Sequence, residues 1–368
     1  MPGPAPRFLF VPVSGPGGAG EYYRSLAIAR GLERRWPEAR IRFALHREAA
    51  YARDAPYAGL SLVDSPTRSS PQVVEYIHAE RPDVVIFDSS GRLAQYRAAR
   101  EAGARVVYVS SRPKTRWKGF RWRRMRALDQ HWLAQPRFLG GTPTPYERLK
   151  VRLAGGPEVV ILDVLHEPVD AVAVRALQAQ LGLQPGRYVA MCPGGGGDFG
   201  HAIDANRVFA AAAGQIAASQ SLPVVLVLAG TGAEGLGAGA SAAVRRVGTL
   251  PNGQLIGLLR DAAVVAVNGG SLLLQCMAQG LPIVAAPIAG DQAARIRGCA
   301  REGLVHETSL DSAAMTAAVA TLLRDDAARS RLQRRLAELG LRNGVDVAAE
   351  AVARLLDRTR PGARADAT

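Results

Sequence analysis

Short apolar stretches alternate with stretches of helical spacing along this 368-residue chain, and that alternation restricts its fold more than any other feature. Apolar residues at helical spacing indicate amphipathic helices, and short continuous apolar runs between them indicate buried strands. Strands that alternate with helices form a parallel sheet with helices on both faces. The pattern runs through the first half and begins again near residue 185. Central strands are predicted at 8–13, 84–87, 188–192, 224–229 and 264–267.

Two such patterns in succession predict an α/β protein made of two Rossmann-like domains that face each other across a cleft. We expect one domain over residues 1–165 and a second over 166–345, followed by a C-terminal helix and a disordered tail over 346–368. Parallel sheets of this kind bind ligands beyond the carboxyl ends of their strands. The loops at those ends are therefore the places to look for a site.

The most informative loop follows the strand predicted at 264–267. It begins with Gly269, Gly270 and Ser271, which lead into a helix whose N-terminus favours a phosphate group. Ser271 can cap this helix, and Gln275 lies one helical turn later on the same face, within reach of a ribose hydroxyl. Gly280-Leu281-Pro282 then precedes the next strand, and Asp291 and Gln292 follow that strand.

This ordered run resembles the donor-binding half of GT-B glycosyltransferases. It is most similar to family 28, typified by the transferase that adds N-acetylglucosamine to the lipid carrier of peptidoglycan. The resemblance implies that Gln275 stands where that family has an acidic ribose ligand, and that Asp291 and Gln292 contact the donor sugar. It also implies nucleobase contacts at 252–256. The likeness covers residues 185–300 well and 8–110 more loosely, and it does not extend to 111–165.

Two further glycine turns lie at strand ends. The first contains Gly18 and Gly20 and leads to Glu21, at a place where family 28 has a histidine. The second resembles a turn of the related UDP-sugar hydrolase of pseudaminic acid synthesis. Asp88, at the end of its predicted strand, also matches an acidic position of that hydrolase group. Both turns are expected to contact the donor. The second consists of Gly194, Gly195, Gly196 and Gly197.

Two carboxylates are candidates for catalysis. An inverting transferase needs a base that takes the proton from the acceptor hydroxyl, and Glu21 at the start of a helix can serve as that base. The alternative for Glu21 is that it only balances the helix dipole or pairs with Arg24. Asp88 is the second candidate, and its alternative is to cap the following turn. Among the histidines, His131 is expected to line the cleft and His201 to approach the donor phosphates, and both are weaker candidates than the carboxylates.

Basic residues are concentrated in the first half. Residues 1–165 contain 27 Lys and Arg against 15 Asp and Glu, whereas the chain as a whole has 46 against 32. Within 112–126 there are eight basic residues, three large aromatics and no acid, a mixture that suits an anionic membrane surface or a lipid-linked acceptor. Nucleic acid binding and a solvated basic loop are the alternatives. The residues expected to contact membrane or acceptor are Arg116, Trp117, Arg121, Trp122, Arg123 and Arg124.

These features predict an inverting, metal-independent glycosyltransferase of the hexosyl or N-acetylhexosaminyl class, with a UDP-sugar as donor and a carbohydrate or lipid-linked acceptor. No Asp-x-Asp metal motif occurs, and the three cysteines lack metal-ligand spacing, so no metal or other cofactor is expected. Without a membrane-spanning run or a signal peptide, we expect a cytoplasmic protein on the inner face of the membrane. The alternatives are a nucleotide-sugar hydrolase of the same fold and a non-catalytic protein that binds nucleotides or nucleic acid.

Overall fold

The computed structural model describes residues 5–15, 20–49, 51–194, 205–228 and 243–357. These residues form two compact units. The first combines Met1–Leu165 with Arg342–Thr368, and the second is His166–Leu341. The tail expected to be disordered falls within 358–368, which lies outside the described residues, as do Gly18, Gly195, Gly196, Gly197 and His201.

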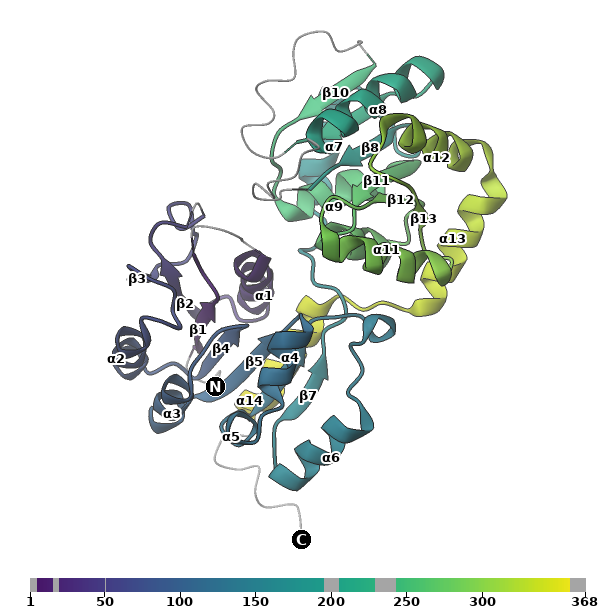
Figure 1. The fold of residues 1–368 in the computed structure, drawn as a ribbon. Coiled ribbons are helices and arrows are strands. Elements are labelled where there is room, and N and C mark those ends of the chain that lie inside the picture. Colours follow the sequence, from purple (N-terminus) through teal and green to yellow (C-terminus); the bar gives the residue numbers. More distant parts are fainter. Residues whose placement is uncertain (1–4, 16–19, 50, 195–204, 229–242, 358–368) are drawn as a thin grey trace. The chain divides into compact units, whose positions relative to one another are not determined.

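The described part of the first unit contains a seven-stranded parallel sheet in the order β3-β2-β1-β4-β5-β6-β7 (Figure 1). Its central strands are buried along nearly their whole length, as expected for a sheet covered on both faces. The strands are β1 (Arg7–Pro12), β2 (Arg40–His46), β3 (Gly59–Leu62), β4 (Val84–Asp88), β5 (Arg105–Ser110), β6 (Gln130–Leu133) and β7 (Glu158–Ile161).

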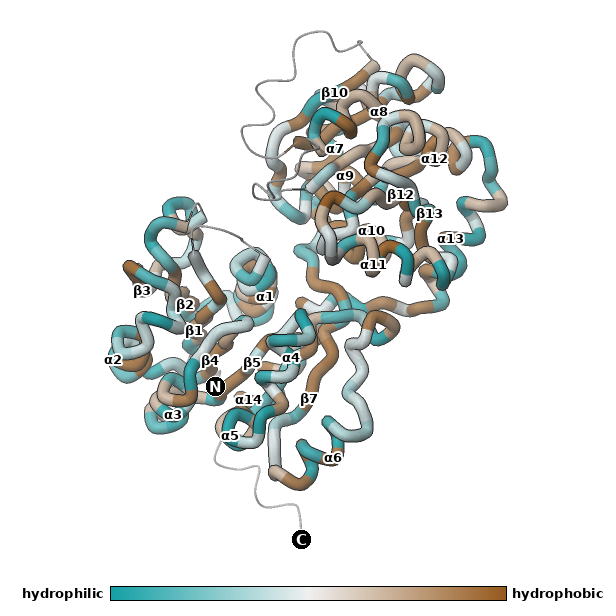
Figure 2. The backbone as a smooth tube through the Cα atoms, in the orientation of Figure 1, coloured by the Kyte–Doolittle hydropathy of each residue, from teal (hydrophilic) through white to brown (hydrophobic). Residues whose placement is uncertain are grey.

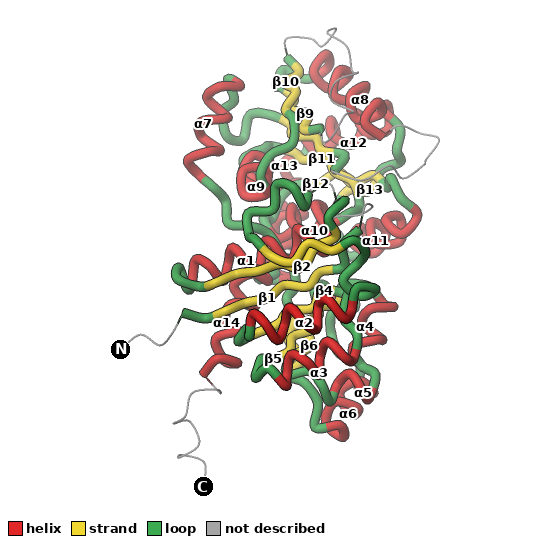
Figure 3. Tube along the Cα trace, turned by 90° about the vertical axis from the view of Figure 1, so that its left-hand side faces the viewer, coloured by secondary structure: helices red, strands yellow, loops and turns green. Residues whose placement is uncertain are grey.

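Alternate side chains of these strands enter two cores, one on each face. Figure 3 shows helices of the first unit beside its strands. Helices α1 (Gly20–Arg35) and α14 (Gly344–Asp357) cover one face, and α2 (Ser70–Glu80) and α3 (Leu93–Glu101) cover the other. A short 3₁₀ helix (Arg137–Leu139) and three further helices lie between β5 and β7 in the sequence. These are α4 (Pro113–Gly119), α5 (Trp122–Met125) and α6 (Pro145–Ala154).

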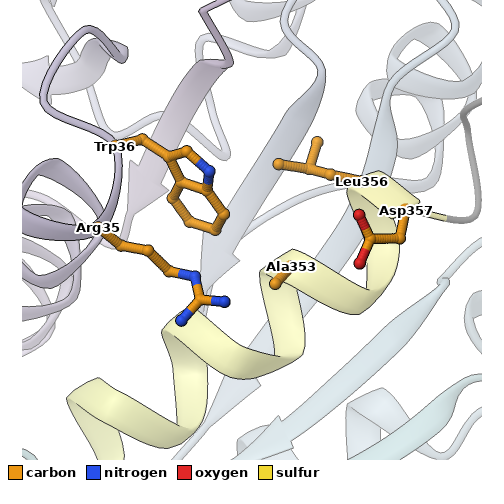
Figure 4. Close-up of a pocket in the computed structure, with 5 residues that line it drawn as sticks. All are labelled: Arg35, Trp36, Ala353, Leu356 and Asp357. Carbon is orange, nitrogen blue, oxygen red and sulfur yellow. The ribbon is translucent and has the colours of Figure 1, made fainter. Parts of the chain in front are cut away.

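The last helix, α14, completes the core of the first unit. A side chain at Gly31 of α1 would lie 2.2 Å from Val345 Cγ1, so the glycine allows the two helices to approach closely. At the other end of this contact, a hollow is lined by Arg35, Trp36, Ala353, Leu356 and Asp357 (Figure 4). The Trp36 ring packs near Phe8 at the start of β1, which places the hollow at the amino edge of the sheet, away from the edge where ligands of parallel sheets bind.

The second unit contains a six-stranded parallel sheet in the order β10-β9-β8-β11-β12-β13. Figure 2 shows its inner strands as hydrophobic segments. The strands are β8 (Val189–Cys192), β9 (Val224–Val227), β10 (Val244–Val247), β11 (Val264–Asn268), β12 (Ile283–Ala286) and β13 (His306–Glu307).

Helices α8 (Ala205–Ser219) and α12 (Ser312–Arg324) pack on one face of this sheet. Helix α10 (Ser271–Ala278) contacts β11 and β12. Helix α9 (Asn252–Arg260) packs against both α10 and α7 (Ala171–Leu181). Helix α11 (Gly290–Arg301) lies beside β12 and β13, and α13 (Asp326–Leu339) follows α12. The predicted fold of two parallel-sheet Rossmann-like domains is therefore confirmed.

In each sheet the strand order reverses at one point. The reversal lies between β1 and β4 in the first unit and between β8 and β11 in the second. A crevice opens at the carboxyl ends of such neighbouring strands because their connections leave in opposite directions. The residues that follow Pro12, Asp88, Cys192 and Asn268 therefore occupy the positions where each sheet binds ligands.

Candidate functional site

The turn after β11 presents the N-terminus of α10 at the carboxyl edge of the second sheet. Gly270 is the N-cap residue in an extended conformation, and the exposed Ser271 is the first residue of the helix. Sequence reasoning had expected Ser271 to be the cap, but its side chain makes no capping hydrogen bond. The N–H groups of the first helical turn have no partner within the helix, so together with the Ser271 hydroxyl they can receive a phosphate.

Asn268 joins the two loops at the reversal point of the second sheet. Its Nδ2 donates to the Pro193 carbonyl at 2.5 Å, and its Oδ1 accepts from the Gly270 N–H at 2.8 Å. Gly194 has a φ of +90°, and a side chain there would lie 2.6 Å from Asn268 Nδ2. Glycine is therefore required at 194 by both conformation and space. Sequence reasoning missed this role of Asn268, which is the polar residue that ends an otherwise apolar strand.

Gln292 holds the glycine turn in addition to the expected sugar contact, which stays a prediction. It is 6% exposed, and its Oε1 accepts from the N–H groups of Gly269 at 3.2 Å and Ile288 at 3.0 Å. A side chain at Gly269 would come within 2.8 Å of Gln292 Cβ and Ile296 Cδ1. Gln292 thus fixes the glycine turn from the protein side, and Gly269 is a glycine because α11 packs against it. The side chain of Asp291 lies outside the described part of the chain.

Gln275 contacts the segment for which nucleobase contacts were expected. Its Oε1 accepts from Asn252 Nδ2 at 3.2 Å, and Asn252 Oδ1 accepts from the Glu167 N–H at 2.9 Å. Asn252 begins α9, so residues 252–256 form the first turns of a helix whose start lies beside α10. The structure therefore brings Gln275 and this segment together, as a nucleoside site requires.

Asp88 at the end of β4 holds Arg24, one turn into α1. Its carboxylate is fully buried and accepts from Arg24 Nε at 2.8 Å and Nη2 at 2.6 Å. Burial raises the pKa of Asp88, and the guanidinium opposes that rise. For Arg24 the carboxylate outweighs burial and raises the pKa, so this residue stays charged. Both oxygens of this buried carboxylate are engaged by Arg24, and the expectation that Asp88 acts in catalysis stays a prediction.

Glu21 is the remaining carboxylate at this edge. It lies in the first turn of α1, directly after Gly20, with a side chain that is 13% exposed. Its Oε1 pairs with Arg112 Nη2 at 3.0 Å, whereas Arg24 is engaged by Asp88. The Arg112 side chain is 71% exposed, so solvent screens this pair and the arginine can leave at little cost. Glu21 is thus a partly exposed carboxylate with a weakly held partner, and its role as the base stays a prediction.

A polar and aromatic cluster borders Glu21. The Ser14 hydroxyl lies 2.9 Å from the Tyr51 hydroxyl and accepts from the His46 N–H at 3.0 Å. The Tyr51 ring stacks on Tyr22 with 4.0 Å between centroids. These contacts hold Ser14, which lies just after β1, and Tyr22, the neighbour of Glu21 at the start of α1.

His131 belongs to the core and not to a ligand-binding edge. It is fully buried on β6, its Nε2 lies 2.8 Å from the Ser110 hydroxyl, and a side chain at Gly119 would collide with its ring. Burial, together with the nearby charge of Arg116, lowers its pKa to about 3. His131 therefore remains neutral in the folded protein at physiological pH and is not a general base for a ligand.

This burial predicts a pH-dependent stability. The unfolded chain takes up a proton on His131 below about pH 6.5, whereas the folded first unit does so only near pH 3, so the free energy of unfolding decreases as pH falls through that window. His131→Gln should flatten the decrease by up to about 1.4 kcal/mol per pH unit. All four tryptophans lie in the first unit, so urea unfolding followed by tryptophan fluorescence reports on it alone. The exposed His78 offers a control, and identical slopes for wild type and His131→Gln would contradict the prediction.

The basic segment divides into structural and exposed residues. Arg116 pairs with Glu147 and donates to the carbonyls of Gly140 and Thr142, which fixes the loop before α6. Arg124 donates to the Tyr96 hydroxyl at 3.1 Å and the Gly91 carbonyl at 3.0 Å. These two arginines are therefore engaged by the protein, and their contact with a membrane or acceptor stays a prediction. The other residues of that prediction are exposed, namely Trp117, Arg121, Trp122 and Arg123.

The described residues lack two features, a metal cluster and a membrane-spanning helix. They contain no group of three or more His, Cys, Asp or Glu arranged to hold a metal ion. Among them there is also no helix long and apolar enough to cross a membrane.

Comparison with known proteins establishes the fold class. The chain matches no protein-family model and no curated protein sequence. Its structure is similar to the glycosyltransferase of kitacinnamycin (19% identity, TM-score 0.62, covering 96% of this chain and 100% of that one). It is also similar to the spinosyn rhamnosyltransferase SpnG (16%, 0.63, 95% and 100%). A protein assigned as a UDP-N-acetylglucosamine 2-epimerase from Listeria monocytogenes is similar too (13%, 0.59, 95% of both chains).

At these identities the likeness establishes a fold and not an activity, because one fold carries many chemistries. That fold is GT-B, two Rossmann-like domains in succession, as the sequence predicted. The finer resemblance to family 28 stays a prediction.

Proposed function

We propose that this protein is an inverting glycosyltransferase whose second unit binds a nucleoside-diphosphate sugar, with UDP as the nucleotide. The first unit is proposed to bind a carbohydrate or lipid-linked acceptor. The observation that carries this proposal is that each sheet has a candidate functional group at the point where its own strand order reverses. The N-terminus of α10, which can receive an anion, lies at the reversal of the second sheet, and the partly exposed carboxylate of Glu21 follows β1 at the reversal of the first sheet, which supports the proposal.

In the proposed reaction Glu21 takes the proton from an acceptor hydroxyl as that oxygen attacks the anomeric carbon of the donor. A new glycosidic bond forms while the bond from the anomeric carbon to the diphosphate oxygen breaks, and attack from the opposite side inverts the configuration. The N-terminus of α10, with Ser271 and the turn at Gly194, stabilises the charge on the departing nucleoside diphosphate. In this reaction the helix N–H groups stabilise the departing diphosphate, and no metal ion takes part in the proposed step.

A ligand screen tests the nucleotide part of the proposal. Thermal unfolding should be measured by dye fluorescence in the presence of UDP, dTDP and GDP and of their common hexose and N-acetylhexosamine conjugates. We expect one nucleotide and its conjugates to raise the unfolding temperature because they bind only the folded state. If none of them shifts the transition, the proposed donor site is wrong. If the bound donor releases free sugar rapidly without any acceptor, the protein is a hydrolase of the same fold.

The ribose contact can be tested at Gln275. Gln275→Ala should weaken nucleoside-diphosphate binding by about 1 kcal/mol, the usual net value of a neutral hydrogen bond, or roughly fivefold. Ser271→Ala should have an effect of similar size. The control is Gln184→Ala, which removes an exposed glutamine from the loop before β8, at the amino edge of the same sheet. Calorimetry that finds equal affinity in wild type, Gln275→Ala and Ser271→Ala would exclude this placement of the nucleotide.

A further inference from the structure

Helix α6 presents large apolar side chains to solvent. Tyr146, Leu149 and Leu153 are 68%, 52% and 66% exposed, and their spacing places them along one side of the helix. The helix is held by its other side, where Val151 and Ala154 pack against a core of Phe120, Met125 and Leu133. A single exposed leucine is common in folded proteins, but several large apolar side chains exposed together on one side of a helix indicate a surface that contacts another molecule.

Two exposed tryptophans extend this surface. Trp117 on α4 and Trp122 on α5 are 59% and 43% exposed. The Lys150 ammonium lies 6.0 Å from the ring centroid of Trp122 and 5.4 Å from that of Tyr146, so α5 and α6 adjoin there. Figure 1 shows α5 and α6 at the lower end of the first unit with α4 above α5, and Figure 2 shows hydrophobic and hydrophilic stretches alternating along α6. Helix α4 is joined to α6 by the pair of Arg116 and Glu147. We call this surface the apolar face. It consists of Trp117, Trp122, Tyr146, Leu149 and Leu153.

The charge around the apolar face has one sign. Residues 112–156 contain twelve Lys and Arg but only two acids, Asp129 and Glu147. Both acids are engaged by arginines, since Asp129 accepts from Arg105 at 3.2 Å and Glu147 accepts from Arg116 at 2.9 Å. Several of the remaining cations are exposed beside the apolar side chains, namely Arg121, Arg123, Arg126, Arg148 and Arg152. The apolar face therefore has a rim of exposed arginines, and within 112–156 the two acids are already paired with other arginines.

We propose that the apolar face inserts between the headgroups of an anionic lipid bilayer, with α6 lying in the plane of the interface. An interfacial helix combines apolar side chains that enter the acyl boundary with flanking cations that meet lipid phosphates, and tryptophan favours the same depth. Leu149 and Leu153 distinguish this partner from nucleic acid, which is bound by cations and stacking aromatics and gains nothing from exposed aliphatic groups. A second copy of the chain is disfavoured because a two-fold contact would bring two strongly cationic surfaces together.

This inference deepens the proposed function, because a lipid-bound first unit would meet an acceptor that resides in the membrane. It also revises which residues face the lipid. Arg116 and Arg124, which are hydrogen-bonded to the protein, are no longer among the residues proposed to face the lipid. The inserting element is α6, which lies outside residues 112–126.

Vesicle partitioning without nucleotide tests the inference. The full chain should bind vesicles of phosphatidylcholine with 30 mol% phosphatidylglycerol and leave pure phosphatidylcholine vesicles unbound, and the fluorescence of the exposed tryptophans should shift to shorter wavelength on binding. The combined change Leu149→Ser and Leu153→Ser alters no charge and should weaken partitioning by about tenfold or more, since two exposed isobutyl groups no longer enter the bilayer. The control is Val172→Ser, at a 71% exposed apolar residue of α7 in the second unit, and it should leave partitioning unchanged.

Unchanged partitioning of the double leucine variant would overturn the inference, and so would absence of binding by the wild-type chain. Retention of a single-stranded oligonucleotide in place of vesicles would identify the face as a nucleic-acid surface. Loss of a wild-type dimer in the leucine variant, without vesicle binding, would identify a contact between copies. UDP binding measured on the same samples separates the two proposals, because vesicle binding can fail while nucleotide binding persists, and the reverse. Thermal unfolding of the double variant confirms that it is folded.

Discussion

Glu21→Gln should reduce turnover by roughly 10²- to 10⁴-fold, the usual contribution of a general base. Glutamine keeps the size and polarity of the side chain but cannot accept the acceptor's proton. Donor affinity, measured by calorimetry with the nucleotide found in the ligand screen, should stay close to that of wild type because Glu21 lies in the first unit. The reaction is followed as release of nucleoside diphosphate from the bound sugar donor.

Glu38→Gln is the matched control for this variant. Glu38 is an exposed glutamate just beyond the end of α1, so the same chemical change is made at a position remote from the carboxyl edge of the sheet. Its turnover should equal that of wild type. A Glu21→Gln protein with nearly full turnover would remove Glu21 from the mechanism and would leave no accessible carboxylate at the first reversal point among the residues discussed above.

Asp88→Asn should lower the free energy of unfolding of the first unit by about 3–5 kcal/mol. Removing one partner of a buried ion pair leaves the other charge uncompensated in a medium that solvates it poorly, and that penalty exceeds the value of the pair itself. Arg24→Met should be destabilising for the same reason. The double variant should lose clearly less than the sum of the two, because neither charge is then left alone. Urea unfolding followed by tryptophan fluorescence measures all four proteins.

A surface pair serves as the comparison. Arg68 and Asp64 lie 3.5 Å apart with side chains 75% and 47% exposed, and Arg68→Met should cost less than about 1 kcal/mol. If Asp88→Asn left stability unchanged and abolished turnover instead, Asp88 would be a catalytic residue after all. Additive losses in the double variant would show that the two side chains do not act as a pair.

The sequence predicted the elements whose signal is local. Buried central strands such as β1, β4 and β11 are short continuous apolar runs, and the adjoining helices have regular apolar spacing, so the parallel sheets and the fold class follow from the pattern alone. Strands β6 and β7, the last two strands on one side of the first sheet, were not predicted. Their four-residue segments contain polar members such as Gln130, His131 and Glu158, whose burial or pairing depends on contacts far away in the chain.

The candidate site was predicted at the level of loops and less well at the level of side chains. The glycine turns at 194 and 269–270 do lie at a strand-order reversal, since glycine marks such turns by its own conformation. The partners of Asp88 and Gln292 could not be deduced, because a carboxylate or amide at a strand end can face either a ligand or the protein. The choice is made by Arg24 for Asp88, and by the packing of α11 against the glycine turn for Gln292.

Helix α14 has a consequence for the order of events on the ribosome. Its residues 344–357 supply part of the core beneath β6 and β7, where Gln130 donates to the Ala351 carbonyl at 3.1 Å. The whole of the second unit therefore emerges before the first can be completed, although the first unit begins the chain. Until α14 arrives, it cannot pack against apolar side chains of this core such as Trp132 and Val160. The first unit, although it is synthesised first, can therefore reach its native state only after the second unit has been made.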